Sequence, residues 1–257
     1  MTGIVTLPLV PLRISDSELS EMTSQLLFGE CIEILEIREN WLSIRNLSDN
    51  YSGWIDRKMI KILSDNQAIS YVNIAPYCVS VPLLNCKNSS GENVIIPGGS
   101  LLPAFTGGKC KIDDEIFTVE SGEQIISKPV NGDQICNLAK QYLNAPFLWG
   151  GKSIFGIDSS GLVQLVFSIG GIYLPRDSFH QVECGQVIDF LSEAKAGDLA
   201  FFENTDGEIV HVGIMLNNNQ IIHSSGSVKI ETIDYQGIIS TPNGKYTHKL
   251  RVIKRLI

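Results

Sequence analysis

Positive charge is scarce in this 257-residue chain. It has 20 Lys and Arg residues against 28 Asp and Glu, a formal net charge of −8 at pH 7, and no block of basic residues stands out. Nucleic acids and anionic membrane surfaces are bound mainly by basic patches. The composition therefore argues against nucleic acid and against a membrane surface as the main partner.

Long apolar runs and targeting signals are also missing. No apolar stretch approaches the ~20 residues that span a bilayer. Residues 1–8 lack the basic start and the small-residue cleavage site of a signal peptide. We therefore expect a cytoplasmic monomer. The alternative is a periplasmic protein whose export signal has been removed from the sequence.

Paired cysteines and metal-binding motifs are lacking too. The six cysteines are scattered without a CxxC pair, and the four histidines show no HExxH spacing. Because a chain of this length can bury a core without disulfides, we interpret the cysteines as small hydrophobic residues of the interior. No metal and no cofactor are expected.

What the sequence does contain, at its start, is β-strand patterning. Residues 29–37 alternate apolar and polar side chains with the period of a half-buried strand, and 41–45 and 51–55 are similar segments separated by polar residues. No stretch of a dozen residues here has helical spacing. We predict a small all-β barrel over residues 1–65.

The next part of the chain continues in the same manner. Residues 79–84 and 113–119 are strand-like, and glycine pairs at 98–99 and 107–108 mark turns between them. We predict a second small barrel over 66–128.

The pattern changes after residue 129. Apolar residues at helical spacing predict a helix over 133–143, and a second, mostly apolar helix is predicted over 158–167. Three strand-like segments follow, at 197–202, 211–216 and 220–224. Helices followed by adjacent antiparallel strands indicate an α+β domain, which we predict over 129–257. The fold class of the chain is then α+β, with two small barrels before the larger domain.

Three residues of this domain are candidates for chemistry. Ser159 stands at the first turn of the apolar helix, where free N–H groups and the helix dipole favour a developing negative charge. His211 opens one strand and His223 lies near the end of the next, about a hairpin apart. Taken singly, the serine is an ordinary helix cap and each histidine an ordinary structural residue. Together they predict a nucleophile, a base and a residue that orients the base.

The motifs around these residues resemble a known family. Segments 146–151, 156–163 and 197–199, with those around His211 and His223, are similar to the NlpC/P60 cysteine peptidases over roughly half the chain. The segment containing Trp41, Tyr51 and Gly53-Trp54 is similar to bacterial SH3 domains. The resemblance implies a papain-like fold, with the nucleophile at Ser159, the base at His211 and the orienting residue at His223.

Two SH3-like barrels before such a domain resemble the γ-D-glutamyl-L-diamino-acid endopeptidases of murein recycling. The resemblance implies cleavage of short murein peptides that carry a free N-terminal L-alanine. A carboxylate and a hydroxyl can accept hydrogen bonds from the substrate ammonium. The residues then implied in substrate binding are Asp158, Ser160, Trp149, Arg176, Asp177, Ser178, Glu21 and Tyr51.

The serine at position 159 departs from the family pattern, which has cysteine there. A helix terminus and an imidazolium can ionise a thiol but not a serine hydroxyl. We therefore expect a nearly inactive form, through either a deliberate replacement of cysteine or a natural serine. Two other functions stay open: a non-catalytic protein that binds wall peptides, and a papain-like amidase or acyltransferase acting on another substrate.

Overall fold

The computed structural model describes residues 1–72, 77–119, 125–126, 131–241 and 243–257. It consists of two compact units. Unit 1 comprises Met1–Lys128 and Trp149–Ile154, and unit 2 comprises Pro129–Leu148 and Phe155–Ile257. The predicted domain boundary at 128–129 lies outside the described residues, so the domain limits stay predictions.

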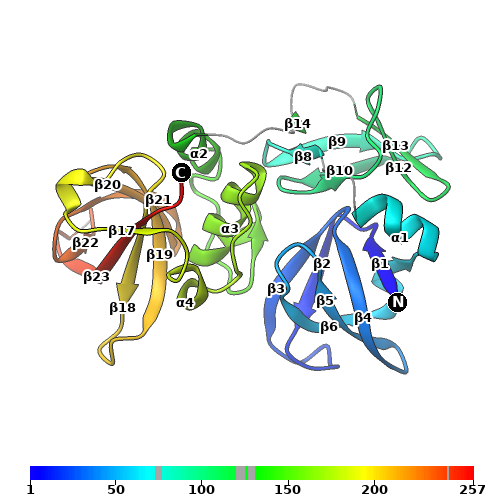
Figure 1. Ribbon diagram of the computed structural model, residues 1–257, viewed down its shortest axis with the longest axis horizontal. Coiled ribbons are helices and arrows are strands. Elements are labelled where there is room, and N and C mark those ends of the chain that lie inside the picture. Colours follow the sequence, from blue (N-terminus) through cyan, green and yellow to red (C-terminus); the bar gives the residue numbers. More distant parts are fainter. Residues whose placement is uncertain (73–76, 120–124, 127–130, 242) are drawn as a thin grey trace. The chain divides into compact units, whose positions relative to one another are not determined.

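Unit 1 begins with a small antiparallel barrel, whose strands are ordered β3-β2-β6-β5-β4-β1-β7 (Figure 1). These strands are β1 (Thr2–Val5), β2 (Leu9–Arg13), β3 (Met22–Leu27), β4 (Cys31–Arg38), β5 (Trp41–Asn46), β6 (Ser52–Asp56) and β7 (Ile60–Ile62). Alternate side chains such as Leu42 and Ile44 fill its core. The strands predicted over 29–55 are confirmed as β4, β5 and β6.

A second small barrel follows, made of two sheets with strand orders β10-β9-β13-β12 and β11-β8-β14. Its strands are β8 (Tyr77–Val79), β9 (Leu83–Lys87), β10 (Asn93–Pro97), β11 (Leu101–Leu102), β12 (Lys109–Ile112), β13 (Glu115–Val119) and β14 (Ile125–Ile126). Helix α1 (Asp65–Val72), at the start of this region, was not predicted. This eight-residue helix is too short to show a clear period, and it begins where Ser64 bonds to Gln67.

The two barrels of unit 1 share a hydrophobic core. Phe28 and Cys31 of the first barrel pack in one cluster with side chains of the second, and the Phe28 ring meets that of Phe117 edge-on at 4.8 Å. Gly29 lies at this junction with φ +81°, and a Cβ atom on it would stand 2.0 Å from the carbonyl oxygen of Leu101. The close approach of the two backbones therefore depends on glycine.

Replacing Gly29 with alanine tests this junction. Gly29→Ala combines a left-handed backbone conformation with a steric clash, and we expect a loss of about 2–5 kcal/mol in the free energy of unfolding. Gly91→Ala is the matched control: its φ is also +81°, but nothing lies within 4 Å of the added Cβ. The control should lose about 1–2 kcal/mol at most. Equal losses in urea unfolding would contradict the packing argument.

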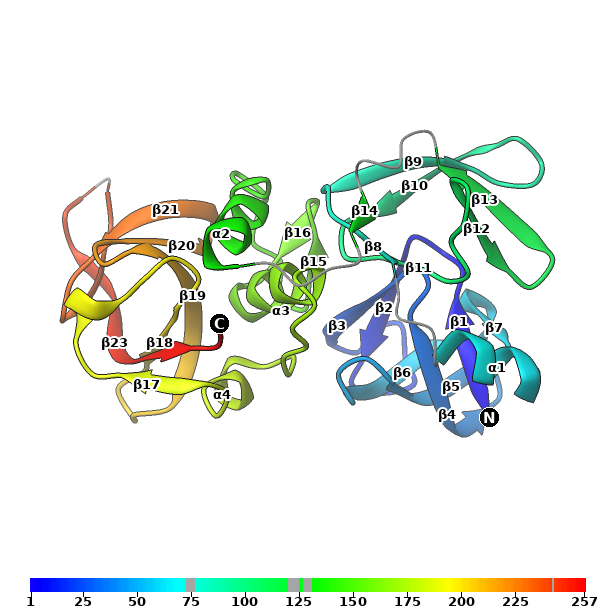
Figure 2. The same cartoon turned by 45° about the horizontal axis from the view of Figure 1, so that its top comes forward.

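Unit 2 is built around a closed ring of strands. Its sheet has the order β17-β23-β18-β19-β20-β21-β22, and a further pairing of β22 with β23 closes six of these strands into a barrel (Figure 2). The strands are β17 (Gln186–Ile188), β18 (Leu199–Glu203), β19 (Ile209–Asn217), β20 (Gln220–Ser225), β21 (Ser227–Ile233), β22 (Gly237–Ile239) and β23 (Tyr246–Arg255). The three adjacent antiparallel strands predicted from the sequence are confirmed as β18, β19 and β20.

Three helices pack against this barrel: α2 (Gly132–Lys140), α3 (Ser159–Ile169) and α4 (Ser178–Gln181). Asn131 and Gln134 form a capping box at the start of α2, which confirms the predicted helix. Helix α3 contacts β19 and β20 and is buried nearly all round, as its apolar composition requires. The chain is thus an α+β protein in which two small barrels precede a larger domain. Among the described helices, none has the length and apolar character needed to cross a membrane.

The cysteines lie where the sequence predicts, with one exception. All six are free thiols; five are buried and Cys184 is partly exposed. Burial raises the pKa of the Cys31 thiol to about 11 and the pKa values of Cys78 and Cys110 to about 12. These three thiols are therefore protonated at neutral pH and act as apolar side chains.

Candidate active site

The start of α3 is held by a buried ion pair. Asp158 caps the helix, and its carboxylate accepts a hydrogen bond of 2.7 Å from the N–H of Gly161. The guanidinium of Arg176 donates to both oxygens of the same carboxylate, at 3.0 and 2.6 Å, and to Ser160 Oγ at 2.9 Å. Asp158 and Arg176 are only 5% and 2% exposed. The two charges neutralise each other and lock the first turn of the helix.

Two further side chains fasten the same turn. The Gln181 side-chain amide donates to the carbonyl of Ser160 at 3.1 Å, and Ser224 Oγ donates to the carbonyl of Ile157 at 2.7 Å. Ser224 directly follows His223 in β20, so this bond ties the segment before Ser159 to the strand of a candidate catalytic histidine. Ser159, at the first position of α3, is 7% exposed.

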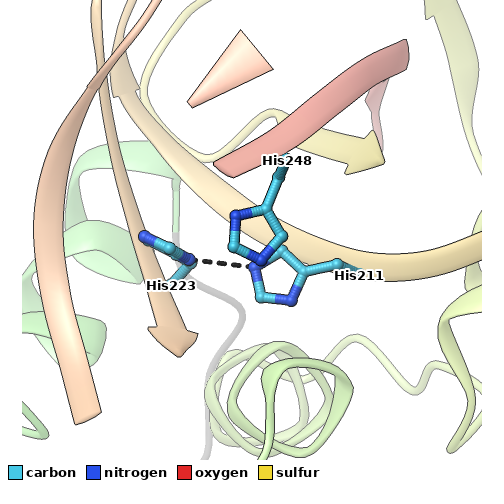
Figure 3. A group of neighbouring side chains, drawn as sticks. All are labelled: His211, His223 and His248. Carbon is cyan, nitrogen blue, oxygen red and sulfur yellow. Dashed lines mark hydrogen bonds between the residues drawn. The ribbon is translucent and has the colours of Figure 1, made fainter. Parts of the chain in front are cut away.

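The two predicted histidines are hydrogen-bonded to each other. His211 Nε2 and His223 Nδ1 lie 2.9 Å apart (Figure 3). On its other side, His223 Nε2 lies 3.0 Å from Glu231 Oε2 on β21. His211 is 7% exposed, and His223 is fully buried. The result is a chain of three side chains that runs inward from His211 to a carboxylate.

The hydrogen bonds of this chain determine which ring nitrogen carries each proton. An ionised carboxylate only accepts hydrogen bonds, so His223 donates through Nε2 and its Nδ1 is an acceptor. His211 must then donate through Nε2, which leaves a free electron pair on its Nδ1. A neutral His211 is therefore prepared to take up a proton at Nδ1.

The pKa values of these groups support the same protonation states. Burial lowers the pKa of His211 well below its ordinary value, and the neighbouring His248 and His223 add to this effect. Burial also lowers the pKa of His223 to about 4, despite its bond to Glu231. Burial alone would raise the pKa of Glu231, but hydrogen bonds from the Thr241 N–H and His223, with the charge of Lys229, keep that pKa below its ordinary value.

Two residues of this cluster, Glu231 and His248, were not predicted from the sequence. Glu231 lies diagonally across the β20–β21 hairpin from His223, whose direct partner in the register is Lys229. The turn at Ser225-Gly226-Ser227, read as a hairpin, would have predicted this pairing. His248 lies on β23, and its ring stacks on that of His211 with 4.1 Å between centroids. No local sequence pattern predicts the contact between His248 and His211.

The predicted substrate-binding residues of unit 2 lie near the start of α3 and α4. Asp158 and Ser160 are engaged by Arg176, as described above, so the buried Arg176 has a structural role that the sequence did not reveal. Asp177 immediately precedes α4, and Ser178 is its first residue and is 8% exposed. That these residues bind substrate stays a prediction.

Three predicted residues belong to unit 1. Trp149 is 62% exposed, and its indole N–H donates to Glu21 Oε1 at 2.6 Å. Gly150, with φ +77°, leaves room for the backbone of Met22. Tyr51 packs on the core of the first barrel. The segment carrying Trp149 is thereby fastened to the barrel, and its part in substrate binding stays a prediction.

The arrangement in unit 2 is that of a hydrolase with a covalent mechanism. A nucleophile position opens a buried helix, and an oriented imidazole with a free electron pair lies on the strands against which that helix packs. Helices packed on a strand barrel, with these residues at their junction, are the arrangement expected of a papain-like hydrolase.

Similarity to known proteins identifies the family of this hydrolase more closely. Residues 144–253 match the model of the NlpC/P60 family, and residues 12–60 match that of the bacterial dipeptidyl-peptidase Sh3 domain. A γ-D-glutamyl-L-lysine dipeptidyl-peptidase of Bacillus subtilis is 30% identical over 217 residues, 78% of this chain and 71% of the relative. The chain therefore belongs to the NlpC/P60 family, and its class is that of the cell-wall peptide hydrolases.

Two further similarities extend over most of the molecule. A γ-D-glutamyl-L-lysine dipeptidyl-peptidase of Bacillus cereus is 25% identical over 255 residues, 86% of this chain and 73% of the relative. The crystal structure of an NlpC/P60 family protein from Bacillus cereus superposes with a TM-score of 0.85 at 18% identity, covering 100% of this chain and 99% of the other. The expected fold, a papain-like domain after two SH3-like barrels, is confirmed.

The ion pair at the start of α3 can be tested by mutation. Arg176→Met leaves the Asp158 carboxylate buried without its partner, and we expect a loss of about 3–5 kcal/mol in the free energy of unfolding. Arg45→Met is the control, because Arg45 pairs with Glu33 at the surface and should contribute about 1 kcal/mol or less. Urea unfolding measures both variants. A loss from Arg176→Met no larger than that of the control would contradict the role given to this pair.

Proposed function

We propose that the site of this protein is that of a peptidase for short murein peptides with a free N-terminal L-alanine. The bond cleaved is the one between γ-D-glutamate and an L-diamino acid. The observation that carries the proposal is the placement of Ser159 at the start of α3, beside strands that carry the His211–His223–Glu231 chain. Similarity to two γ-D-glutamyl-L-lysine dipeptidyl-peptidases, over both the small barrels and the larger domain, supports the choice of substrate.

The proposed reaction is an acyl transfer to the side chain at position 159. With cysteine at this position, the thiol gives its proton to His211 Nδ1. The thiolate then attacks the γ-carbonyl carbon, and the N–H groups at the start of α3 stabilise the resulting oxyanion. His211 gives its proton to the departing amine as the C–N bond breaks. Water then attacks the acyl-enzyme, with His211 as the base, and releases the γ-glutamyl product.

The substrate's free amine is proposed to bind near the start of α4. The Asp177 carboxylate can neutralise an ammonium group and the Ser178 hydroxyl can accept a hydrogen bond from it. Arg176 supports this region indirectly, because its guanidinium is taken up by Asp158 and Ser160. Glu21, Tyr51 and Trp149 stay predicted contributors from unit 1.

Serine at position 159 is proposed to suppress turnover while preserving the site. A thiol, with an ordinary pKa of about 8.5, can be ionised by a helix terminus and an imidazolium. A serine hydroxyl must instead lose its proton as it attacks, which demands a differently placed base and oxyanion site. The hydrogen bonds that orient His211 and those that fix the turn around position 159 do not depend on which of the two side chains is present.

Hydrolysis of defined peptides tests the proposal. The substrates are L-Ala-γ-D-Glu-L-Lys and its diaminopimelate analogue, each with a free or an acetylated alanine amine. We expect Ser159→Cys to release L-Ala-γ-D-Glu from the free peptides, and the unmodified chain to be slower by at least about 10³-fold, the size of a lost nucleophile. Acetylation should abolish cleavage. If Ser159→Cys cuts none of the free peptides, the proposed function is wrong.

The serine itself favours a second candidate, a protein that binds wall peptides without cleaving them. In that case calorimetry would detect binding of the free tripeptide by the unmodified chain, and Ser159→Cys would bind it equally well without hydrolysis. Release of dipeptide by the cysteine form would exclude this candidate.

The carboxylate behind the histidines gives a sharper test of the mechanism. In the Ser159→Cys background, Glu231→Gln keeps the size of the side chain but can donate to His223 and so disturb both tautomers. We expect kcat to fall by about tenfold or more, yet by less than the 10²–10⁴ that a general base contributes, with KM little changed. Glu208→Gln, at an exposed turn residue, is the control. Unchanged kcat in Glu231→Gln would contradict the positioning role.

A further inference from the structure

We propose that His211, His223 and His248 form a binding site for a divalent transition-metal ion such as Zn²⁺. Each histidine offers one ring nitrogen, and these three atoms all lie within 4.8 Å of one another. Figure 3 shows the three rings gathered together, with His211 and His223 joined by their hydrogen bond. Imidazole nitrogen is a favoured ligand of Zn²⁺, and three histidines are a sufficient protein ligand set.

The three ligands come from a rigid part of the fold. They stand on β19, β20 and β23, three strands of the closed barrel of unit 2. The rings of His211 and His248 are stacked at an interplanar angle of 26°, and each also packs beside the Phe202 ring. A site on paired strands holds its ligands more precisely than one on loops.

The surroundings of His223 are those of a metal ligand. Its Nε2 lies 3.0 Å from Glu231, so its Nδ1 is left as the nitrogen that faces the cluster. A carboxylate behind a ligating histidine fixes the tautomer and strengthens the ligand. Lys229 opposes a cation here, but its ammonium group lies 3.5 Å from Glu231 Oε2, which offsets its charge. Burial also lowers the pKa values of all three imidazoles, which favours the neutral form that binds metals.

One of the three histidines lines a pocket. His248 is only partly buried and lines an open pocket of about 570 Å³, together with residues that include Tyr235, Tyr246 and Lys249. Lys249 is engaged by Glu203, which reduces the repulsion of an incoming cation. The pocket brings solvent to the His248 side of the cluster, and we take this as the side from which an ion enters.

Binding requires a small movement and a change of tautomer at His211. Zn–N bonds of ~2.0–2.1 Å in a tetrahedral site place the nitrogens ~3.3–3.4 Å apart. Nitrogens that now lie as much as 4.8 Å apart must therefore approach, whereas His211 Nε2 and His223 Nδ1, at 2.9 Å, must move slightly apart. The ion replaces the proton between His211 Nε2 and His223 Nδ1. The proton displaced from His211 Nε2 moves through solvent to Nδ1, where the electron pair of the base was, so no net proton is lost. If the proposed function holds, a bound metal therefore blocks catalysis; the metal site itself does not rest on that function.

Calorimetric titration with ZnCl₂ tests the site, using metal-free full-length protein without a histidine tag. His248→Phe removes one ligand while keeping an aromatic ring against His211. His180→Gln is the control, because His180 is exposed on α4 and lies outside the cluster. Thermal unfolding without metal establishes that each variant is folded, and the visible absorption of added Co²⁺ reports the coordination geometry.

We expect one Zn²⁺ per chain, an affinity at least tenfold weaker in His248→Phe, and no change in His180→Gln. The Co²⁺ complex should show the intense bands of a tetrahedral site, and these should be weakened in His248→Phe only. The proposal is overturned if the unmodified chain binds no Zn²⁺ at 1:1, if folded His248→Phe binds as tightly, or if His180→Gln abolishes binding. None of these readouts uses peptide hydrolysis, so they are independent of the test of the proposed function.

Discussion

The buried ion pair between Asp158 and Arg176 is the contact on which the geometry of the site depends. One carboxylate accepts from the Gly161 N–H and from two guanidinium nitrogens, in surroundings where an unpaired charge would be strongly unfavourable. The first turn of α3 therefore cannot shift without breaking several charge-assisted hydrogen bonds together. Ser159 inherits this rigidity because it stands between the capping residue and the next bonded residue, Ser160. Much of the polar sequence around the nucleophile position serves to fix a backbone.

The closed barrel of unit 2 fixes the positions of the histidines, as the ion pair fixes the position of Ser159. Six strands paired in a ring leave no free edge at which the register could slip. The register places Glu231 diagonally from His223, and a Cβ on Gly213 of β19 would stand 3.0 Å from the His223 Cβ. The glycine thus leaves room for the His223 ring to reach His211. The tautomers and orientations of His211 and His223 follow from strand pairing. They do not depend on the side chain at the nucleophile position.

This separation explains how a serine can occupy the nucleophile position in an intact site. The frame around it is held by Arg176, Gln181 and Ser224, none of which depends on a thiol. The electron pairs of the histidines are equally independent of it. A cluster of three neutral imidazoles beside a carboxylate has two chemical uses, as an oriented base and as a metal ligand set. With the His211 proton on Nε2, between His211 and His223, the base is available; with that proton on Nδ1, the metal ligand set is available.

Local sequence patterns were enough to predict much of this protein. Period-two alternation predicted β4 to β6, helical spacing predicted α2 and α3, and the motifs around Ser159, His211 and His223 indicated the family that the comparisons established. Such signals work because they depend on neighbours a few residues apart. The helix α1, the role of Arg176, and the positions of Glu231 and His248 were not predicted. Arg176 and His248 acquire their roles from partners 18 and 37 residues away, at Asp158 and His211. Contacts of that kind exist only once the barrel has closed and the helices have packed on it, so only the tertiary structure could decide them.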